Sequence, residues 1–333
     1  MIAFRKRAFA FVSAIFILGA CSSNSASPEP KKEDGEKEKK ETYTIGVTQI
    51  QEHPALNEAT EGFQKALEEA GLDVEYDIQN AQGDNTANDT IATNFVSANV
   101  DLIFANSTPS AQAALSKTTE IPIVFTSVVD PVGAELVESM EKPGGNVTGT
   151  SHHHPDSIPK TLEFFKEELK AKKIGTVYNS GEQNSRAQID KLKKQMDDYG
   201  LELVEATVST TADVKQATES IIDQVDAFYV ITDNTVVSAF ESVADVTTDK
   251  KVPLLAADIA SVPRGAFAAY GVDFFEVGHE AGKMAVKILT EEAKPADIPA
   301  QPPKTLLFMV NKKVADTIEM DIKPEWNAEI YEE

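Results

Sequence analysis

Residues 43–71 read YTIGVTQIQEHPALNEATEGFQKALEEAG, and this stretch decides the fold class. It opens with a short apolar run, Tyr43–Val47, that predicts a strand. Gly71 stands where a following helix would end. One strand followed directly by one helix is the building unit of a parallel α/β sheet. The apolar residues of the predicted helix recur at helical spacing, and they are Leu56, Ala59, Phe63, Ala66, Leu67 and Ala70.

The same unit recurs along the rest of the chain. A first run of predicted strands ends near Thr150, and a second run begins after it. Two such runs predict an α/β protein with two doubly wound parallel-sheet domains, joined by a hinge, with a ligand cleft between them. Further strands are predicted at 74–78, 102–105, 121–125, 147–150, 174–178, 202–206, 227–231, 252–256 and 305–310, and helices at 84–98, from 109, and at 157–170, 183–199, 212–223, 235–247 and 281–289.

The N-terminal end has the layout of an export signal. A positive segment, Arg5–Arg7, precedes an apolar run, Ala8–Leu18, which is too short for a membrane span of about 20 residues. The tetrapeptide Leu18–Cys21 resembles a bacterial lipobox, in which the signal is cut before a cysteine that then carries a lipid. We therefore expect a signal peptide at 1–20 and lipidation of Cys21. The alternative is a signal cleaved elsewhere, with this cysteine incidental.

Composition restricts the partners of the chain. Residues 22–41 contain no large apolar side chain, so we expect 21–41 to be a lipid anchor followed by a disordered linker. The net charge of −23 becomes −26 when the three cationic residues of the predicted signal are removed. Such a chain repels nucleic acid and anionic membrane surfaces. We expect an exported protein held by its lipid at the outer face of the cell membrane. Cys21 is the only cysteine, so no disulfide is expected.

Polar side chains follow the predicted strands of both runs. The carboxyl ends of parallel strands form the ligand-binding edge of an open α/β sheet. The alternative is that these residues only cap the helices that follow. We predict that they converge on one small ligand, and the candidates are Gln51, His53, Asn106, Ser107, Thr108, Thr126, Ser127, Asp130, Asn179, Asn184, Ser185, Asp233, Asn234 and Asp258.

The chemistry of these candidates favours a zwitterionic ligand. Thr108-Pro109 is typical of a helix start, whose free N–H groups suit a carboxylate, and Ser107 and Thr108 add hydroxyls. No basic residue stands among the candidates, which argues against a phosphate or dicarboxylate ligand. His53 is either a wall of the cleft or an entry residue of the first helix. The acids that could pair with an ammonium group are Asp130, Asp233 and Asp258.

Several longer segments carry a family resemblance. The chain resembles the substrate-binding lipoproteins of ABC importers, in the group that takes up tryptophan, tyrosine or phenylalanine. NSTP at 106–109 and YNSGEQNS at 178–185 are the specific motifs. The matching segments are IGVTQIQEHPALNEATEGFQKAL at 45–67, ANSTPSAQAAL at 105–115, TSVVDPVGAELV at 126–137, GTVYNSGEQNSRAQ at 175–188, ITDNTVVSAFESV at 231–243, GAFAAYGVDFFEVGHEAGKMAVKIL at 265–289 and MVNKKVADTIEMDIKPE at 309–325.

The resemblance implies a fold and partners. It implies a type I periplasmic-binding-protein fold that closes on an amino acid and delivers it to a permease with a separate ATPase. It also implies three chain crossings between the lobes. The first lobe would hold residues 42–150 plus about 272–292, and the second 151–271 plus about 293–333. We expect a monomer without cofactors. The alternatives are a sensor that presents its ligand to a membrane receptor, and a binder of another small polar organic solute.

The chain departs from the family pattern at two places, and its motifs do not favour an enzyme. Residues His152–His154 follow the first predicted crossing, where we expect a solvated hinge without a metal, because neighbouring residues of an extended segment point to opposite sides. Phe274 stands where the family often has tyrosine. An enzyme is not expected, because no phosphate-binding glycine loop, nucleophile elbow or nucleophile–histidine arrangement is present.

Overall fold

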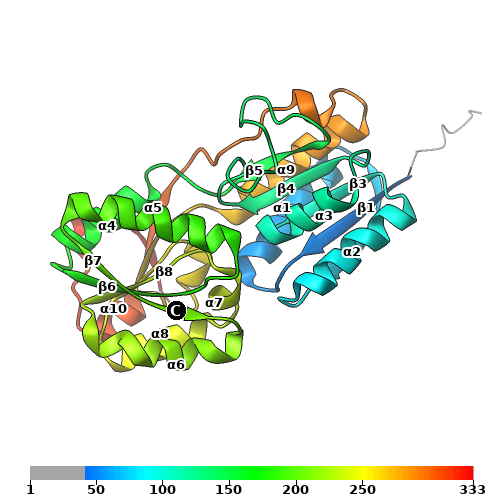
Figure 1. Ribbon diagram of the computed structural model, residues 1–333. Coiled ribbons are helices and arrows are strands. Elements are labelled where there is room, and N and C mark those ends of the chain that lie inside the picture. The colour runs from blue at the N-terminus through cyan, green and yellow to red at the C-terminus, as the bar shows by residue number, and fades with distance from the viewer. Residues whose placement is uncertain (1–41, 333) are drawn as a thin grey trace, which may run out of the picture. The chain divides into compact units, whose positions relative to one another are not determined.

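The computed structural model describes residues 42–332, which form two β-sheets covered by helices (Figure 1). The first sheet is wholly parallel, in the order β2-β1-β3-β4-β5. In this order, β2 lies on one side of β1, and β3, β4 and β5 follow on the other side. The strand order therefore reverses between β1 and β3, and ligands of such sheets bind at this point. The strands are β1 (Thr42–Gln49), β2 (Asp73–Asn80), β3 (Leu102–Asn106), β4 (Ile123–Val128) and β5 (Val147–Ser151).

Alternation along β3 shows how helices cover both faces of the first sheet. Leu102 and Phe104 belong to the core under α1 (Pro54–Glu69) and α9 (Phe274–Leu289). Ile103 and Ala105 belong to the core under α2 (Asn85–Ala98) and α3 (Thr108–Lys117). Successive side chains of a strand point to opposite faces, so a fully apolar strand is the expected result of burial on both sides.

Two glycines join α9 to the first sheet. A Cβ atom at Gly278 would lie 1.9 Å from the carbonyl oxygen of Ala59, and one at Gly62 would lie 2.0 Å from that of Phe275. Only glycine permits helix backbones to approach so closely. The helix α9, which follows β10 of the second sheet, therefore packs on α1 of the first.

The second sheet has the order β12-β11-β10-β9-β8-β6-β7. Its strands are β6 (Lys173–Asn179), β7 (Glu202–Val208), β8 (Ala227–Val230), β9 (Leu254–Ala256), β10 (Ala268–Gly271), β11 (Leu307–Asn311) and β12 (Glu329–Tyr331). Its helices are α4 (Ser157–Glu167), α5 (Gln183–Tyr199), α6 (Val214–Ile221), α7 (Asn234–Ser238), α8 (Phe240–Asp249) and α10 (Lys312–Thr317), with short 3₁₀ turns η1 (Thr211–Asp213), η2 (Ile222–Gln224), η3 (Ile259–Ser261), η4 (Pro295–Asp297) and η5 (Pro324–Trp326).

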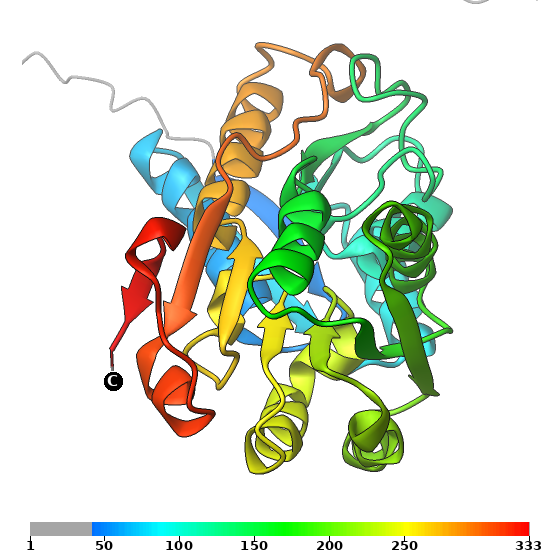
Figure 2. The ribbon, with the colours of Figure 1, turned by 90° about the vertical axis from the view of Figure 1, so that its left-hand side faces the viewer.

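One feature of this sheet differs from the sequence prediction. β11 pairs antiparallel with β10, and in Figure 2 the orange arrow of β11 points opposite to the yellow arrows beside it. A parallel neighbour requires a crossover helix on the same sheet. The helix between these strands, α9, instead lies on the first sheet. The chain passes between the two sheets three times, after β5, before α9 and after α9.

The N-terminal predictions lie outside the described residues. The signal peptide at 1–20, Cys21 and the linker at 21–41 precede β1 and are not described. Within residues 42–332, no helix combines the length and the apolar character needed to cross a membrane.

Candidate ligand-binding site

A small cavity lies where the carboxyl ends of the two sheets meet. Its volume is about 20 Å³, which is room for a single water molecule. The site is where an open α/β fold places its ligand. The lining residues from the first sheet and its crossings are His53, Ala55, Leu56, Ser127, His152 and Phe274, and those from the second are Asn184, Thr232, Asp233, Asn234, Val237 and Asp258.

Unpartnered polar atoms gather around this cavity. Four buried atoms of its lining have no hydrogen-bond partner, and they are His53 Nδ1, Ser127 Oγ, His152 Nδ1 and Asn184 Oδ1. Buried polar groups in folded proteins are nearly always hydrogen-bonded, because an unmade bond costs about 1–3 kcal/mol. A group of such atoms around one cavity indicates where a polar ligand would complete the bonding.

Asp233 is the most completely bonded acid of the cavity. It is fully buried and caps α7, with Oδ1 accepting a hydrogen bond from Val236 N at 2.8 Å. Its Oδ2 accepts from Asn179 N at 2.7 Å and from Ser185 Oγ at 2.6 Å. Burial, with the charge of Glu182 second, raises the pKa of Asp233 to about 7. The predicted residues Asn179 and Ser185 therefore hold this acid in place and do not line the cavity.

Asp258 is the second buried acid and also caps a turn. Its Oδ1 accepts hydrogen bonds from Ser261 N at 2.8 Å and from Ser261 Oγ at 2.9 Å, at the start of η3. Burial raises the pKa of this carboxyl. The nearby Arg264 is bonded to Glu241 and to the carbonyl oxygen of Val237. The cavity lining thus contains two buried carboxyl groups and no lysine or arginine.

Sequence reasoning missed the role of His152. The prediction of a solvated hinge is wrong for this residue, which is 9% exposed and lies 3.0 Å from Thr232 Oγ1 through Nε2. Its ring is 5.3 Å from that of Phe274. The usable signal was its position, since His152 directly follows β5, as Asp233 and Asp258 follow β8 and β9. No cluster of histidine, cysteine or acidic side chains placed for a metal is found among residues 42–332.

The hydrogen bonds of Thr232 assign the tautomer of His152. The single hydroxyl proton of Thr232 goes to Gln188 Oε1 at 2.7 Å. Thr232 Oγ1 therefore accepts from Nε2–H of His152, and Nδ1 carries a free lone pair. Burial lowers the pKa of His152 to about 3, so the ring is neutral. Burial likewise lowers the pKa of His53 to about 3.

The bridge between His152 and Thr232 separates two small spaces. Beyond it lies a second cavity of about 20 Å³. Its apolar lining is Ile158, Leu192, Tyr229, Ile231, Ala257 and Val272. Further contacts join the same two sides, from Gln183 Nε2 to the carbonyl oxygen of Gly133 at 3.2 Å and between Lys191 and His153. The cleft is therefore closed, and both of its spaces are lined by polar and apolar side chains.

Several candidates lie beside this cavity without lining it. Asn106 Nδ2 donates to the carbonyl oxygen of Leu56 at 2.7 Å, and Thr126 shares a 2.9 Å hydrogen bond with Thr150. Ser107 accepts a hydrogen bond from Ser110 N, as a cap of α3. Thr108 Oγ1 is buried and has no partner. The predicted carboxylate site at this helix start thus adjoins the described cavity rather than opening into it.

Two further candidates lie away from the cavity. Asp130 is exposed, and its carboxylate accepts a hydrogen bond from Gly133 N at 2.8 Å. Gln51 is half-buried, and its carbonyl oxygen accepts from Gln49 Nε2 at 2.8 Å. Conversely, the sequence reading missed Glu182, whose carboxylate accepts hydrogen bonds from Asn184, Asn234 and Thr235. It follows a strand end only after a short turn, and no pattern distinguished it.

Comparison with known proteins gives a consistent assignment. The family model of the ABC transporter substrate binding protein matches residues 44–329. The tyrosine-binding protein of Clostridioides difficile (strain R20291) is 43% identical over 317 residues, which cover 93% of this chain and 90% of that protein.

Two solved structures of similar proteins differ in how well they superpose on this chain. The ABC domain from Streptococcus pneumonia in complex with L-Trp has 32% identity and a TM-score of 0.83, covering 87% of this chain and all of that one. The ligand-free, open structure of a substrate-binding protein with adhesive properties from Clostridium difficile has 41% identity but a TM-score of only 0.66, covering 87% and 99%. The described arrangement is thus nearer to the L-Trp complex. The chain belongs to the ABC transporter substrate-binding proteins, a family of transport proteins and not of enzymes.

Proposed function

We propose that this protein captures a free aromatic amino acid, tyrosine, tryptophan or phenylalanine, outside the cell and delivers it to the permease of an ABC importer. The observation that carries the proposal is the set of unpartnered polar atoms around the cleft cavity. The names of two relatives support the ligand class, since one is a tyrosine-binding protein and the other holds L-Trp.

The polar side chains of the cleft suit the amino and carboxylate groups of such a ligand. The ammonium group would lie near Asp233 and Asp258, whose negative charge no basic residue of the lining balances. The lone pair on Nδ1 of His152 adds an acceptor for an N–H donor. The carboxylate would accept a hydrogen bond from Ser127 and, in a more open cleft, from Thr108. Both charges of a buried zwitterion must be compensated in this way.

The apolar side chains of the cleft suit the aromatic ring of the ligand. Leu56, Val237 and Phe274 line the first cavity, and Leu192, Tyr229 and Ile231 are among the residues that line the second. A ring lying across both would replace the hydrogen bond between His152 and Thr232. Two spaces of about 20 Å³ cannot hold an amino acid, so the two sheets must separate for entry. We propose that the lobes are 42–150 plus about 272–292 and 151–271 plus about 293–333, with α9 moving as part of the first.

The anchoring is a separate part of the proposal. Removal of the signal at 1–20 would leave Cys21 as a lipidated first residue, followed by a linker to β1. Replacing Cys21 with serine and fractionating cells tests this, because the variant should leave the membrane fraction. A variant as membrane-bound as the parent contradicts it. The permease, its ATPase and the monomeric state belong to this proposal as well.

Calorimetric titration of the soluble body with the twenty amino acids tests the ligand class. Tyrosine, tryptophan or phenylalanine should bind with one-to-one stoichiometry and return unchanged. At about 100 times its dissociation constant, the ligand should stabilise the fold by about 2.7 kcal/mol. Leucine and glutamate serve as controls for an apolar but non-aromatic and for a dicarboxylate ligand. Binding of none of the three aromatic amino acids contradicts the proposal.

A further inference from the structure

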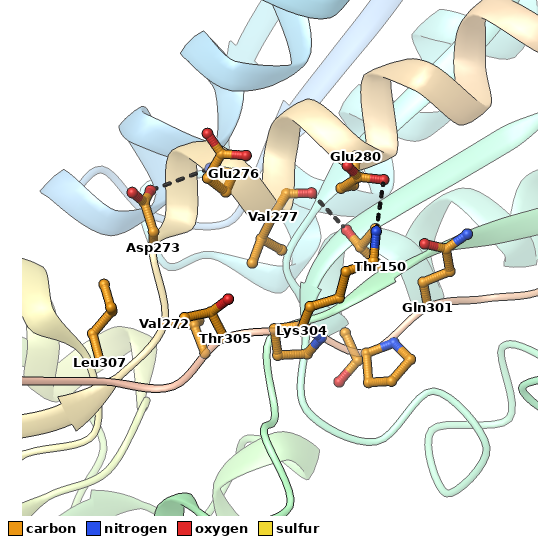
Figure 3. Close-up of a pocket in the computed structure, with 13 residues that line it drawn as sticks. Thr150, Val272, Asp273, Glu276, Val277, Glu280, Gln301, Lys304, Thr305 and Leu307 are labelled. Atoms are coloured by element: carbon orange, nitrogen blue, oxygen red, sulfur yellow. Dashed lines mark hydrogen bonds and ion pairs between the residues drawn. The ribbon is translucent and has the colours of Figure 1, made fainter.

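A cavity outside the cleft is larger than either of the two spaces within it. A cavity of about 290 Å³ lies among the three chain crossings between the sheets (Figure 3). It is lined by Thr150 and Ser151 at the first crossing, by Val272 and Asp273 at the second, and by the segment 301–307 at the third. We call it the hinge cavity. Its volume is near the lower limit of small-molecule sites in proteins.

The segment 301–307 forms one wall as a strap fixed at both ends. At one end Gln301 N donates to the carbonyl oxygen of Gly149 at 3.0 Å, and Gln301 accepts from Ser151 N at 2.9 Å. At the other end Leu307 pairs with Gly271 in the antiparallel ladder. Pro302 and Pro303, which lack N–H donors, lie between these ends. The hollow beneath the strap is therefore part of the fold, held open by its two attachments.

The first two turns of α9 form the opposite wall. Val277 faces the cavity, and its carbonyl oxygen accepts a hydrogen bond from Thr150 Oγ1 at 3.1 Å (Figure 3). Val272, Leu307 and the two prolines complete an apolar lining. An occupant therefore needs an apolar body.

The charges at the rim are unbalanced. Asp273 accepts a hydrogen bond from Glu276 N at 3.2 Å as the cap of α9. Glu280 pairs with Lys283 at 2.9 Å and with Lys304 at 4.0 Å. The exposed carboxylate of Glu276 has no ion-pair partner among residues 42–332. Three carboxylates thus face one cavity to which a single lysine, Lys304, contributes. Glu276 is therefore the carboxylate of this rim that is available to pair with the positive charge of a ligand.

We propose that the hinge cavity is a second ligand site, which takes a small amine with an apolar body, the ammonium group beside Glu276 and the body against Val272, Val277 and Leu307. The walls at 150–151, 272–273 and 301–307 belong to crossings, whose backbone must change when the lobes separate, whereas the wall formed by α9 moves with the first lobe. An occupant therefore binds open and closed forms unequally, and by linkage it alters the affinity of the cleft for its own ligand. The coupling to the cleft rests on the proposed function, whereas binding in the hinge cavity does not.

Cyclohexylamine is the probe for the site, because it has no aromatic ring to enter the cleft. Its binding to the soluble body is followed by saturation-transfer NMR, with cyclohexanol and cyclohexanecarboxylate as neutral and anionic controls at equal ionic strength. The amine should bind more tightly than either control, and an excess of tyrosine should not displace it. Equal binding of cyclohexanol, displacement by simple competition or absence of binding overturns the proposal.

Two variants locate the bound amine. Thr305→Trp fills the cavity and should abolish binding. Glu276→Gln removes the unpaired charge and should weaken binding up to about fivefold, the upper end of the range for an exposed ion pair. Glu219→Gln, an exposed glutamate of α6, is the matched control and should change nothing. Unchanged binding in both cavity variants overturns the assignment.

Coupling between the two sites is measured separately. The affinity for tyrosine is determined in saturating cyclohexylamine and compared with the affinity in an equal concentration of sodium chloride. A change of at least about threefold that is absent in Thr305→Trp is expected. An unchanged affinity overturns the coupling. If tyrosine does not bind at all, the proposed function fails, while the NMR result on the hinge cavity still stands.

Discussion

The two sides of the cleft differ in how their polar groups are bonded. On the second sheet, Asp233, Asp258 and Gln188 have their acceptors occupied by neighbouring N–H and hydroxyl groups. On the first, Ser127 Oγ and Thr108 Oγ1 are buried without partners. The acids of the second side are therefore held in place before the ligand arrives, whereas most of the unmade bonds lie on the first side, with Asn184 Oδ1 the one such atom of the cavity lining on the second. The predictions below test this difference, from the largest effect to the smallest.

Asp233→Ala should have the largest effect. It removes a buried helix cap with three hydrogen bonds, so the free energy of unfolding should fall by about 2–4 kcal/mol. Loss of a buried charge partner should weaken amino-acid binding by about 2–5 kcal/mol, or roughly 30- to several thousand-fold. Denaturant unfolding and calorimetry measure the two effects.

Asp233→Asn separates them, because asparagine caps helices well but carries no charge. Its amide nitrogen must face either Val236 N or Asn179 N, which are both donors, so this variant should recover only part of the stability lost in Asp233→Ala and should still lose affinity. Full affinity in Asp233→Asn would move the ammonium group to Asp258 alone.

Ser127→Ala should lower affinity without lowering stability. Its hydroxyl has no partner in the described structure, so the free energy of unfolding should not fall, whereas the ligand should lose about 1–3 kcal/mol of binding. Thr126→Ala is the matched control, because its hydroxyl is bonded to Thr150 and not to the cavity. It should cost stability of about 1 kcal/mol and leave the ligand affinity unchanged. The reverse pattern would exchange the roles of the two residues.

The third prediction concerns pH and His152. Its pKa is about 3 when folded and ordinarily 6.5, so the unfolded state binds a proton that the folded state does not, and stability falls as the pH drops below 6.5. His152→Gln should therefore gain about 1 kcal/mol relative to the parent between pH 7 and 5.5. The comparison must be made as this difference, because the raised pKa of Asp233 acts in the opposite direction. Denaturant unfolding at both pH values measures it; a pH-independent difference contradicts the buried, neutral ring.

Asp130→Ala should have the smallest effect. Its carboxylate is exposed and bonded only to the local turn, so both stability and affinity should change by less than about 0.5 kcal/mol. Calorimetry on this variant sharpens the comparison between the sides, since a large loss would show that the cleft closes further around Asp130 than described.

The sequence reading succeeded where a structure depends on neighbours along the chain. The apolar runs that became β1, β3, β4, β6 and β8, and the helical spacing of α1 and α5, were predicted correctly because burial on both faces and helical periodicity are local patterns. β10 and β12 were missed because strands of four and three residues show no such pattern. The antiparallel direction of β11 was missed because it depends on where α9 packs.

The candidate site followed the same rule. The sequence by itself determined that Asp233 and Asp258 follow strand ends and that the lobes carry a cleft, whereas Thr126 and Ser127, which it placed after a strand, lie within β4. Tertiary structure alone decided that Asp130 points to solvent, that Asn106 is used within the first lobe, and that His152 is buried against Thr232, 80 residues away. A side chain's type and its place after a strand are properties of the chain, but whether its polar atoms have partners depends on residues far apart in sequence that meet only when the two sheets close.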